Sequence, residues 1–255
     1  GSLFFIHYRG LAAVVSEVKP DKFKARAAAA EKEIDMDWIE EKAREHERIV
    51  EQLMKENDLL PAKFGSIVNN KEGLEKFLAG NYHEYVRAFQ RIRGCREWDV
   101  KTYLNLEKLK RFIGENTPEI RERMEMLSSL SNNGTYLIKR KVDRMIGQRI
   151  GKRCKDMALH IAEALKDICE EEAFSCTELP EDRQAHTSLI FKASYLVSQA
   201  MLHRFNERIN ELSDELEPEG AVIKITGPWP PYTFVKDKQK EHVERSLARL
   251  LFPLK

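Results

Sequence analysis

The segment AVIKITGPWPPYTF, residues Ala221 to Phe234, is the stretch from which the fold of the C-terminal half can be worked out. It begins with an apolar run that is typical of a strand, and it continues into eight residues that contain three prolines and three aromatic residues. Proline fixes its own φ, lacks a backbone donor and pushes the preceding residue toward extended geometry. We therefore expect a strand that runs into a rigid, aromatic turn.

Upstream of this strand, alternation and helical periodicity predict five further elements. They are a strand at 98–104, a helical region at 118–173 broken near 132–134, strands at 174–179 and 187–197, and a helix at 199–216. This is the βαββαβ order of a ferredoxin-like domain with an enlarged first helical crossover. Its first and last strands are antiparallel neighbours, so we expect Trp98 to lie near Trp229.

The N-terminal part predicts a smaller domain of mixed helix and strand. Its expected elements are strands at 3–8 and 11–18, a helix at 37–54, an extended stretch at 62–68, and a helix that begins at the cap Asn70 and ends at Gly94. We therefore predict an α+β protein with two domains, at residues 1–94 and 95–235, followed by an amphipathic tail at 236–255.

Composition favours a cytoplasmic protein without a membrane partner. Lys and Arg number 43 against 42 for Asp and Glu, and this net charge of +1 does not indicate a dominant nucleic-acid surface. No apolar run approaches the roughly 20 residues that a membrane-spanning helix needs. The 4 cysteines form no CxxC pair, which is typical of reduced thiols rather than of a disulfide framework.

No motif for catalysis, for a metal or for a cofactor is present in the sequence. Gly147 and Gly151 have the wrong spacing for a phosphate loop, and we interpret them as small residues that let two helices pack closely. His160 and Glu163 share a helical face but lack a third ligand, so a surface pair is favoured over a zinc site. We therefore predict no catalytic residue, no metal site, no cofactor and no small-molecule substrate.

Two apolar groups are candidates for contact with a partner protein. Trp229, Tyr232 and Phe234 lie in the proline-rich turn, and Leu247, Leu250 and Leu251 lie along one side of the tail. A simpler interpretation of the turn is a buried anchor that only shapes the second domain. For the tail, docking on the first domain is favoured over docking on a partner.

The basic run at 139–155 is a different kind of candidate. On one long helix it could contact phosphates, which would make the chain a nucleic-acid-binding or regulatory adaptor. Apolar residues interleave at core spacing, however, and Glu170 to Glu172 balance the charge downstream. A solvated helix face is therefore favoured.

Four stretches of the chain resemble motifs of the gas vesicle protein F/L family (GvpF/GvpL), in the family's order. They are GLAAVVS at 10–16, LPAKFGSIV at 60–68, EWDVK at 97–101 and GPWPPYTF at 227–234. The last is the most specific of the four. The family usually begins with a Tyr-rich strand upstream of Leu3, so we expect an edge of the first sheet to differ here.

The resemblance implies a non-enzymatic accessory protein of gas vesicle assembly. Such proteins are thought to bind the small, hydrophobic shell protein, alone or with other accessory proteins, as chaperone, nucleator or minor vesicle component. A cytoplasmic, gas-vesicle-associated location follows from the same resemblance. The family carries no known catalytic residue, so none is expected in this chain.

Overall fold

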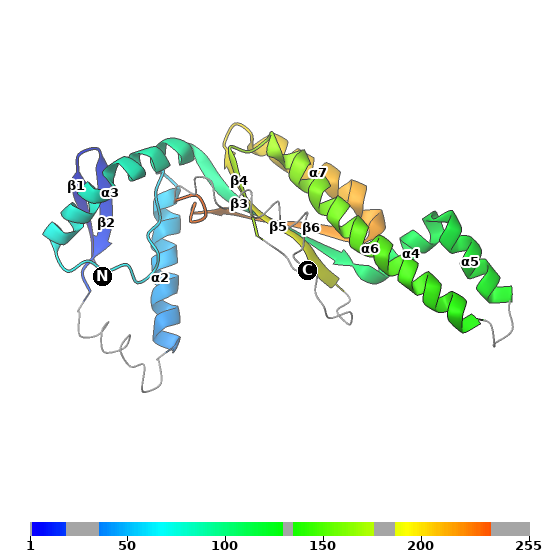
Figure 1. Ribbon diagram of the computed structural model, residues 1–255. Coiled ribbons are helices and arrows are strands. Elements are labelled where there is room, and N and C mark those ends of the chain that lie inside the picture. Colours follow the sequence, from blue (N-terminus) through cyan, green and yellow to red (C-terminus); the bar gives the residue numbers. More distant parts are fainter. Residues whose placement is uncertain (1, 19–35, 130–134, 176–186, 236–255) are drawn as a thin grey trace. The chain divides into compact units, whose positions relative to one another are not determined.

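The computed structural model describes residues 2–18, 36–129, 135–175 and 187–235 (Figure 1). These residues divide into two compact units. Unit 1 contains the described residues up to Arg93 together with the segment that starts at Pro230, and unit 2 runs from Gly94 to Trp229.

Unit 1 combines a β-hairpin with two helices. Strands β1 (Leu3–Tyr8) and β2 (Leu11–Ser16) pair antiparallel, and helices α2 (Met36–Met54) and α3 (Lys71–Ile92) follow. The predicted strands and helices of this part are therefore confirmed. The stretch predicted as extended at 62–68 has no helix or strand and is interrupted by a turn at residues 64 and 65.

Helix α3 begins and ends where the sequence indicates. The Asn70 Oδ1 accepts a hydrogen bond from the Gly73 backbone N–H at 2.8 Å, which satisfies one of the free donors of the first turn. Gly94, just beyond the C-terminus of the helix, has φ of +67°, a conformation that costs glycine nothing. The hairpin packs on this helix through an edge-to-face contact between Tyr8 and Tyr82.

Unit 2 is a four-stranded antiparallel sheet with helices between its strands. The strands are β3 (Cys95–Asn105), β4 (Glu171–Phe174), β5 (Thr187–Ser198) and β6 (Ala221–Trp229), in the order β4-β5-β3-β6. Helices α4 (Leu106–Asn116), α5 (Pro118–Ser129) and α6 (Thr135–Lys166) separate β3 from β4. Helix α7 (Leu202–Leu216) and the 3-10 turn η1 (Glu217–Glu219) separate β5 from β6. This is the predicted ferredoxin-like order with an enlarged first crossover.

The core of unit 2 lies on one face of the sheet. Val100 and Leu104 of β3 are fully buried there, and each of the helices α4 to α7 contributes side chains to the same cluster. Figure 1 shows α6 and α7 running along the sheet. Complete burial of one such aliphatic side chain contributes about 2 kcal/mol, so this layer supplies most of the unit's stability. The alternate residues of the strands point to the opposite face, away from this core.

The first and last strands of the sheet pair as expected. Glu97 lies opposite Trp229 in the register, and Val100 lies opposite Ile225. The predicted proximity of Trp98 and Trp229 is therefore confirmed. A Cβ on Gly227 (φ +139°) would lie 2.9 Å from the Glu97 carbonyl oxygen and 3.0 Å from the Trp98 ring. Glycine is required at this position because β3 approaches the backbone so closely.

Two elements differ from the sequence-based expectation. The sequence-based expectation lacks helix α4, although the Asn105 side chain caps this helix and its residue Leu109 is completely buried. Strand β4 starts at Glu171, inside the region predicted as helix, rather than at Phe174. Two successive glutamates have no preference for a strand, and pairing with β5 decides the conformation of this segment.

Candidate functional site

The proline-rich segment belongs to both units. Trp229 ends β6 in unit 2, whereas Pro230, Pro231 and Phe234 are buried in unit 1. The predicted second domain, residues 95–235, includes residues 230–235, which this division assigns to unit 1. The interpretation of the whole segment as an anchor that only shapes the second domain does not fit this division either, since residues 230–235 belong to unit 1.

Tyr232 is held by a polar contact with α2. Its hydroxyl donates to the Glu47 Oε1 at 3.0 Å. The His46 Nε2 lies 3.0 Å from the Ala62 carbonyl oxygen and must donate to it, so this nitrogen has no lone pair left to accept from Tyr232. Burial, and then the bond to Glu47, raises the pKa of the Tyr232 hydroxyl well above its ordinary value. The phenol therefore stays protonated and remains a donor.

Phe234 is held through both its ring and its backbone. Its side chain is only 3% exposed, and its carbonyl oxygen accepts a hydrogen bond from Arg91 Nη2 in α3 at 2.8 Å. The Phe234 N–H donates in turn to the Pro231 carbonyl oxygen at 3.1 Å. A partner could reach this ring only by displacing it from unit 1.

Trp229 is the most accessible aromatic residue of the segment. Its side chain is 41% exposed, and its indole N–H lies 3.4 Å from the Thr226 hydroxyl. A role of Trp229, Tyr232 and Phe234 in partner binding stays a prediction. The other three candidates, Leu247, Leu250 and Leu251, lie outside the described residues.

Unit 1 also exposes several large apolar side chains that the sequence does not indicate as candidates. Phe5 on the hairpin is 59% exposed and Ile67, in the loop before α3, is 52% exposed. Further exposed apolar side chains of the same unit are Leu3, Phe4, Phe64, Val68 and Phe77. A two-stranded sheet cannot bury both of its faces, and this was the signal in the sequence that could have identified the surface.

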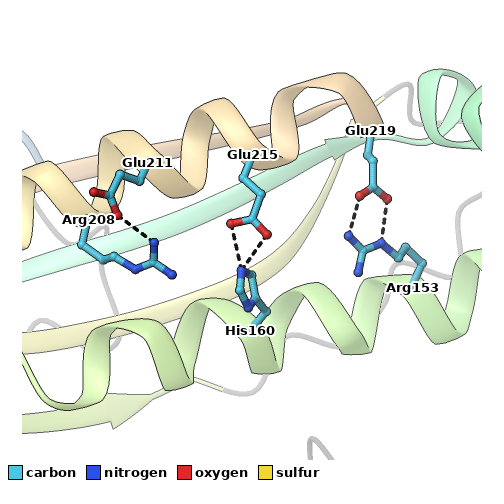
Figure 2. Close-up of polar contacts among 6 residues, drawn as sticks. All are labelled: Arg153, His160, Arg208, Glu211, Glu215 and Glu219. Carbon is cyan, nitrogen blue, oxygen red and sulfur yellow. Dashed lines mark hydrogen bonds and ion pairs between the residues drawn. The ribbon is translucent and has the colours of Figure 1, made fainter.

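The basic helix α6 is partly neutralised by contacts with its neighbours. The Arg153 guanidinium binds both carboxylate oxygens of Glu219, with Nε 2.6 Å from Oε2, and His160 Nε2 lies 3.0 Å from Glu215 (Figure 2). His160 is thus paired with α7 and not with Glu163. No described atom lies within 4 Å of a Cβ built on Gly147 or Gly151, so the predicted close helix packing at these glycines is wrong.

Cys154 and Cys169 form no disulfide, and their thiols ionise poorly. Burial raises the pKa of the Cys154 thiol to about 11 and that of the Cys169 thiol to about 12. Across the described ranges, no group of three or more His, Cys, Asp or Glu side chains could hold a metal ion. None of the described helices is both long enough and apolar enough to cross a membrane.

Comparison with known proteins identifies one family over nearly the whole chain. Residues 1–236 match the family described as gas vesicle synthesis protein GvpL/GvpF. Gas vesicle protein L of Streptomyces sp. is 26% identical over 237 residues, which cover 90% of this chain and 81% of that protein. Gas vesicle protein L of Haloferax mediterranei is 21% identical over 182 residues, which cover 70% of this chain but only 56% of the longer relative.

Two solved structures share the fold. The crystal structure of GvpF from Anabaena sp. PCC7120 has a TM-score of 0.67 at 19% identity and covers 93% of this chain and 89% of its own. The GvpF structure from Microcystis aeruginosa has a TM-score of 0.52, also at 19% identity, and covers 75% of this chain and 76% of its own.

Proposed function

Because the chain belongs to the gas vesicle synthesis protein GvpL/GvpF family, we propose that it is a non-enzymatic accessory protein that binds the small hydrophobic shell protein during vesicle assembly. It acts as assembly factor, nucleator or minor vesicle component, with the shell protein and other accessory proteins as partners. Its working location is the cytoplasm, in association with gas vesicles.

The exposed apolar surface of unit 1 is the observation that carries this proposal. A subunit that builds a gas-facing wall exposes apolar surface before it assembles, and this surface aggregates unless a partner covers it. The hairpin offers such a cover, because Leu3 and Phe5 project from the same strand and are 42% and 59% exposed. Strand β1 pairs only with β2 among the described strands, so its edge can also accept an added strand.

The contact can be tested by co-purification of the shell protein with single variants of the full chain. Phe5→Lys places a charge in the proposed surface, and we expect it to lower recovery of the shell protein at least about tenfold, since a buried unpaired charge costs more than 1.4 kcal/mol. Met126→Lys on α5 is a matched control, because Met126 is also 59% exposed but lies in unit 2.

Equal recovery with Phe5→Lys and with the wild-type chain would refute the proposed surface. Equal losses in both variants would show that the shell protein binds exposed apolar residues wherever they lie on the chain. This result would also contradict the proposed surface. Melting temperatures should match the wild type for both variants, because neither side chain is buried.

The alternative role, a nucleic-acid or regulatory adaptor working through 139–155, has weaker support. Arg153 of this run is held by the buried Glu219, and Arg149 lies beside the exposed Glu119, so part of the run's positive charge is already balanced. Tight DNA or RNA binding that weakens steeply with salt, together with no recovery of shell protein, would favour this alternative.

A further inference from the structure

Three lysines lie side by side on the sheet of unit 2, one on each of three neighbouring strands. Lys101 of β3 is directly opposite Lys192 of β5 on one side and Lys224 of β6 on the other. Directly opposed residues have Cβ atoms about 5 Å apart, so the three lysine side chains leave the sheet along one line across it. We call Lys192, Lys101 and Lys224 the lysine row.

The lysine row lies on the face opposite the helices. Val100 and Thr102, which flank Lys101 in sequence, are completely buried on the core side, so Lys101 points the other way. Lys224 is exposed and Lys101 and Lys192 are half-buried. Beside the row, Val222 on the same face is 51% exposed.

No carboxylate of the described residues forms an ion pair with the lysine row. The nearest acidic residue in the register, Asp99, accepts a hydrogen bond from the Ser194 hydroxyl at 2.6 Å. The ammonium group of Lys224 instead lies 5.4 Å from the centre of the Tyr103 ring, a cation–π contact. Elsewhere the chain does pair its lysines, for example Lys42 with Glu45.

Like charges placed directly opposite each other destabilise a sheet. This cost occurs twice in the lysine row, and among the described residues only the cation–π contact between Lys224 and Tyr103 reduces it. Side chains that lower stability at one place in a fold are typical of a binding surface, where a ligand supplies the missing interaction.

We propose that the lysine row and its neighbours Tyr103 and Val222 form a docking site for an acidic, extended segment of a partner polypeptide. Adjacent strands are about 4.8 Å apart, so the row is about 10 Å wide and matches a short stretch of peptide with several carboxylates. Tyr103 and Val222 line one side of the row and offer apolar contact to the intervening side chains.

The other side of the row favours a peptide over a nucleic acid. Asp99, at the next position of β3 on this face, and Glu171, further along the register on β4, belong to the same face. A phosphate backbone that ran along the strands beyond the row would meet these carboxylates, whereas a short acidic segment that lies across the strands stays on the row. This docking site is separate from the apolar surface of unit 1 and does not depend on the shell-binding proposal.

The test uses the full chain and a fluorescent oligoglutamate peptide, with binding followed by anisotropy at low and at moderate salt. We expect K101Q/K192Q/K224Q to bind the peptide about tenfold more weakly than the wild type. Each lost ion pair with the peptide should lower the affinity about threefold or less. K139Q/K141Q/K152Q is the matched control, because it loses the same charge from exposed positions of α6. This control should bind the peptide like the wild type. K101R/K192R/K224R, which keeps the three positive charges, should also bind the peptide with wild-type affinity.

Thermal unfolding separates loss of the site from loss of the fold. Since removal of like charges relieves repulsion, the melting temperature of K101Q/K192Q/K224Q should equal or exceed that of the wild type. If it falls instead, the test rests on K224Q alone, at an exposed position, with an expected affinity loss of about threefold.

Three results would overturn the proposal. The first is unchanged peptide affinity in both K101Q/K192Q/K224Q and K224Q. The second is an equal loss in the α6 control, which would place the contact on that helix. The third is tighter binding of a single-stranded oligonucleotide of equal charge with a steeper salt dependence, which would identify a nucleic-acid surface.

Discussion

At the scale of single residues, two tyrosine hydroxyls of this chain have opposite environments. The Tyr232 hydroxyl donates to Glu47, whereas the completely buried Tyr195 hydroxyl has no partner among the described atoms. Loss of a hydrogen bond to a charged group costs about 1 to 2 kcal/mol, and a buried unpaired hydroxyl costs a similar amount.

We therefore expect Tyr232→Phe to lower the free energy of unfolding by about 1 kcal/mol, while Tyr195→Phe leaves it unchanged or raises it. Urea unfolding of both variants beside the wild type measures the difference. A large loss in Tyr195→Phe would contradict this assignment, because it would show that the hydroxyl is satisfied.

The buried thiols predict a loss of stability in alkali. Burial raises the pKa of Cys154 to about 11 and of Cys169 to about 12 in the folded chain, while the unfolded thiols ionise near pH 9. The unfolded state then binds fewer protons, so this stability is complete below about pH 8 and decreases as pH rises through 9 and above.

Unfolding titrations at pH 7.5, 9 and 10 should show a decreasing free energy for the wild type. The decrease should be smaller in Cys154→Ala/Cys169→Ala, whatever its stability at neutral pH. Parallel pH profiles for the two proteins would show that the thiols do not carry this effect.

At the scale of elements, two glycines with contrasting surroundings test the packing of β6 against β3. Gly227 has no room for a Cβ and a φ of +139°, whereas Gly147 lies in an exposed part of α6 with open space around it. We expect Gly227→Ala to destabilise the chain by about 2 kcal/mol or more and Gly147→Ala to stabilise it by up to about 1 kcal/mol. Thermal unfolding of the two variants is the measurement, and equal effects would contradict the close approach at Gly227.

The contact between α6 and η1 gives a second prediction at this scale. Glu219 is 8% exposed and depends on Arg153 for its pairing, whereas Arg149 and Glu119 are exposed and 3.9 Å apart. Arg153→Ala should cost about 2 to 3 kcal/mol because it leaves a buried charge unpaired, and Arg149→Ala should cost less than about 1 kcal/mol. Denaturant unfolding compares them, and similar costs would show that Glu219 is solvated.

Most of the elements could be predicted from local patterns. Asn70 and Gly94 bound α3 because cap chemistry acts within a few residues, and the alternation in β3 reflects a sheet with one buried face. The start of strand β4 could not be predicted, since Glu171 and Glu172 become part of a strand only through pairing with β5. The contact of Tyr232 could not be predicted either, because its partner Glu47 is 185 positions away in sequence.

The candidate surfaces were also only partly predictable. The aromatic residues of the proline-rich segment could be recognised, but burial of Phe234 in unit 1 could not. The lysine row requires the register of three strands, which no local pattern supplies. Exposure of Phe5 follows from the absence of a third described strand in its sheet, and this too is a property of the fold rather than of the hairpin sequence.

At the scale of the whole molecule, the two units offer different chemistry to partners. Unit 1 exposes apolar side chains around its hairpin, and the sheet of unit 2 carries a row of lysines that form no ion pair with the described residues. A chain of this kind can bind a hydrophobic subunit through one unit and an acidic segment through the other. Since the two surfaces are proposed on independent grounds, each can fail without the other.

Site-specific photo-crosslinking to the shell protein tests the central claim most directly. A photoreactive residue is placed in the full chain at Phe5 of unit 1 or at Met126 of unit 2, two positions of equal exposure. We predict a crosslinked product with the shell protein from position 5 and little or none from position 126. Equal crosslinking from both positions, or crosslinking from position 126 alone, would contradict the account.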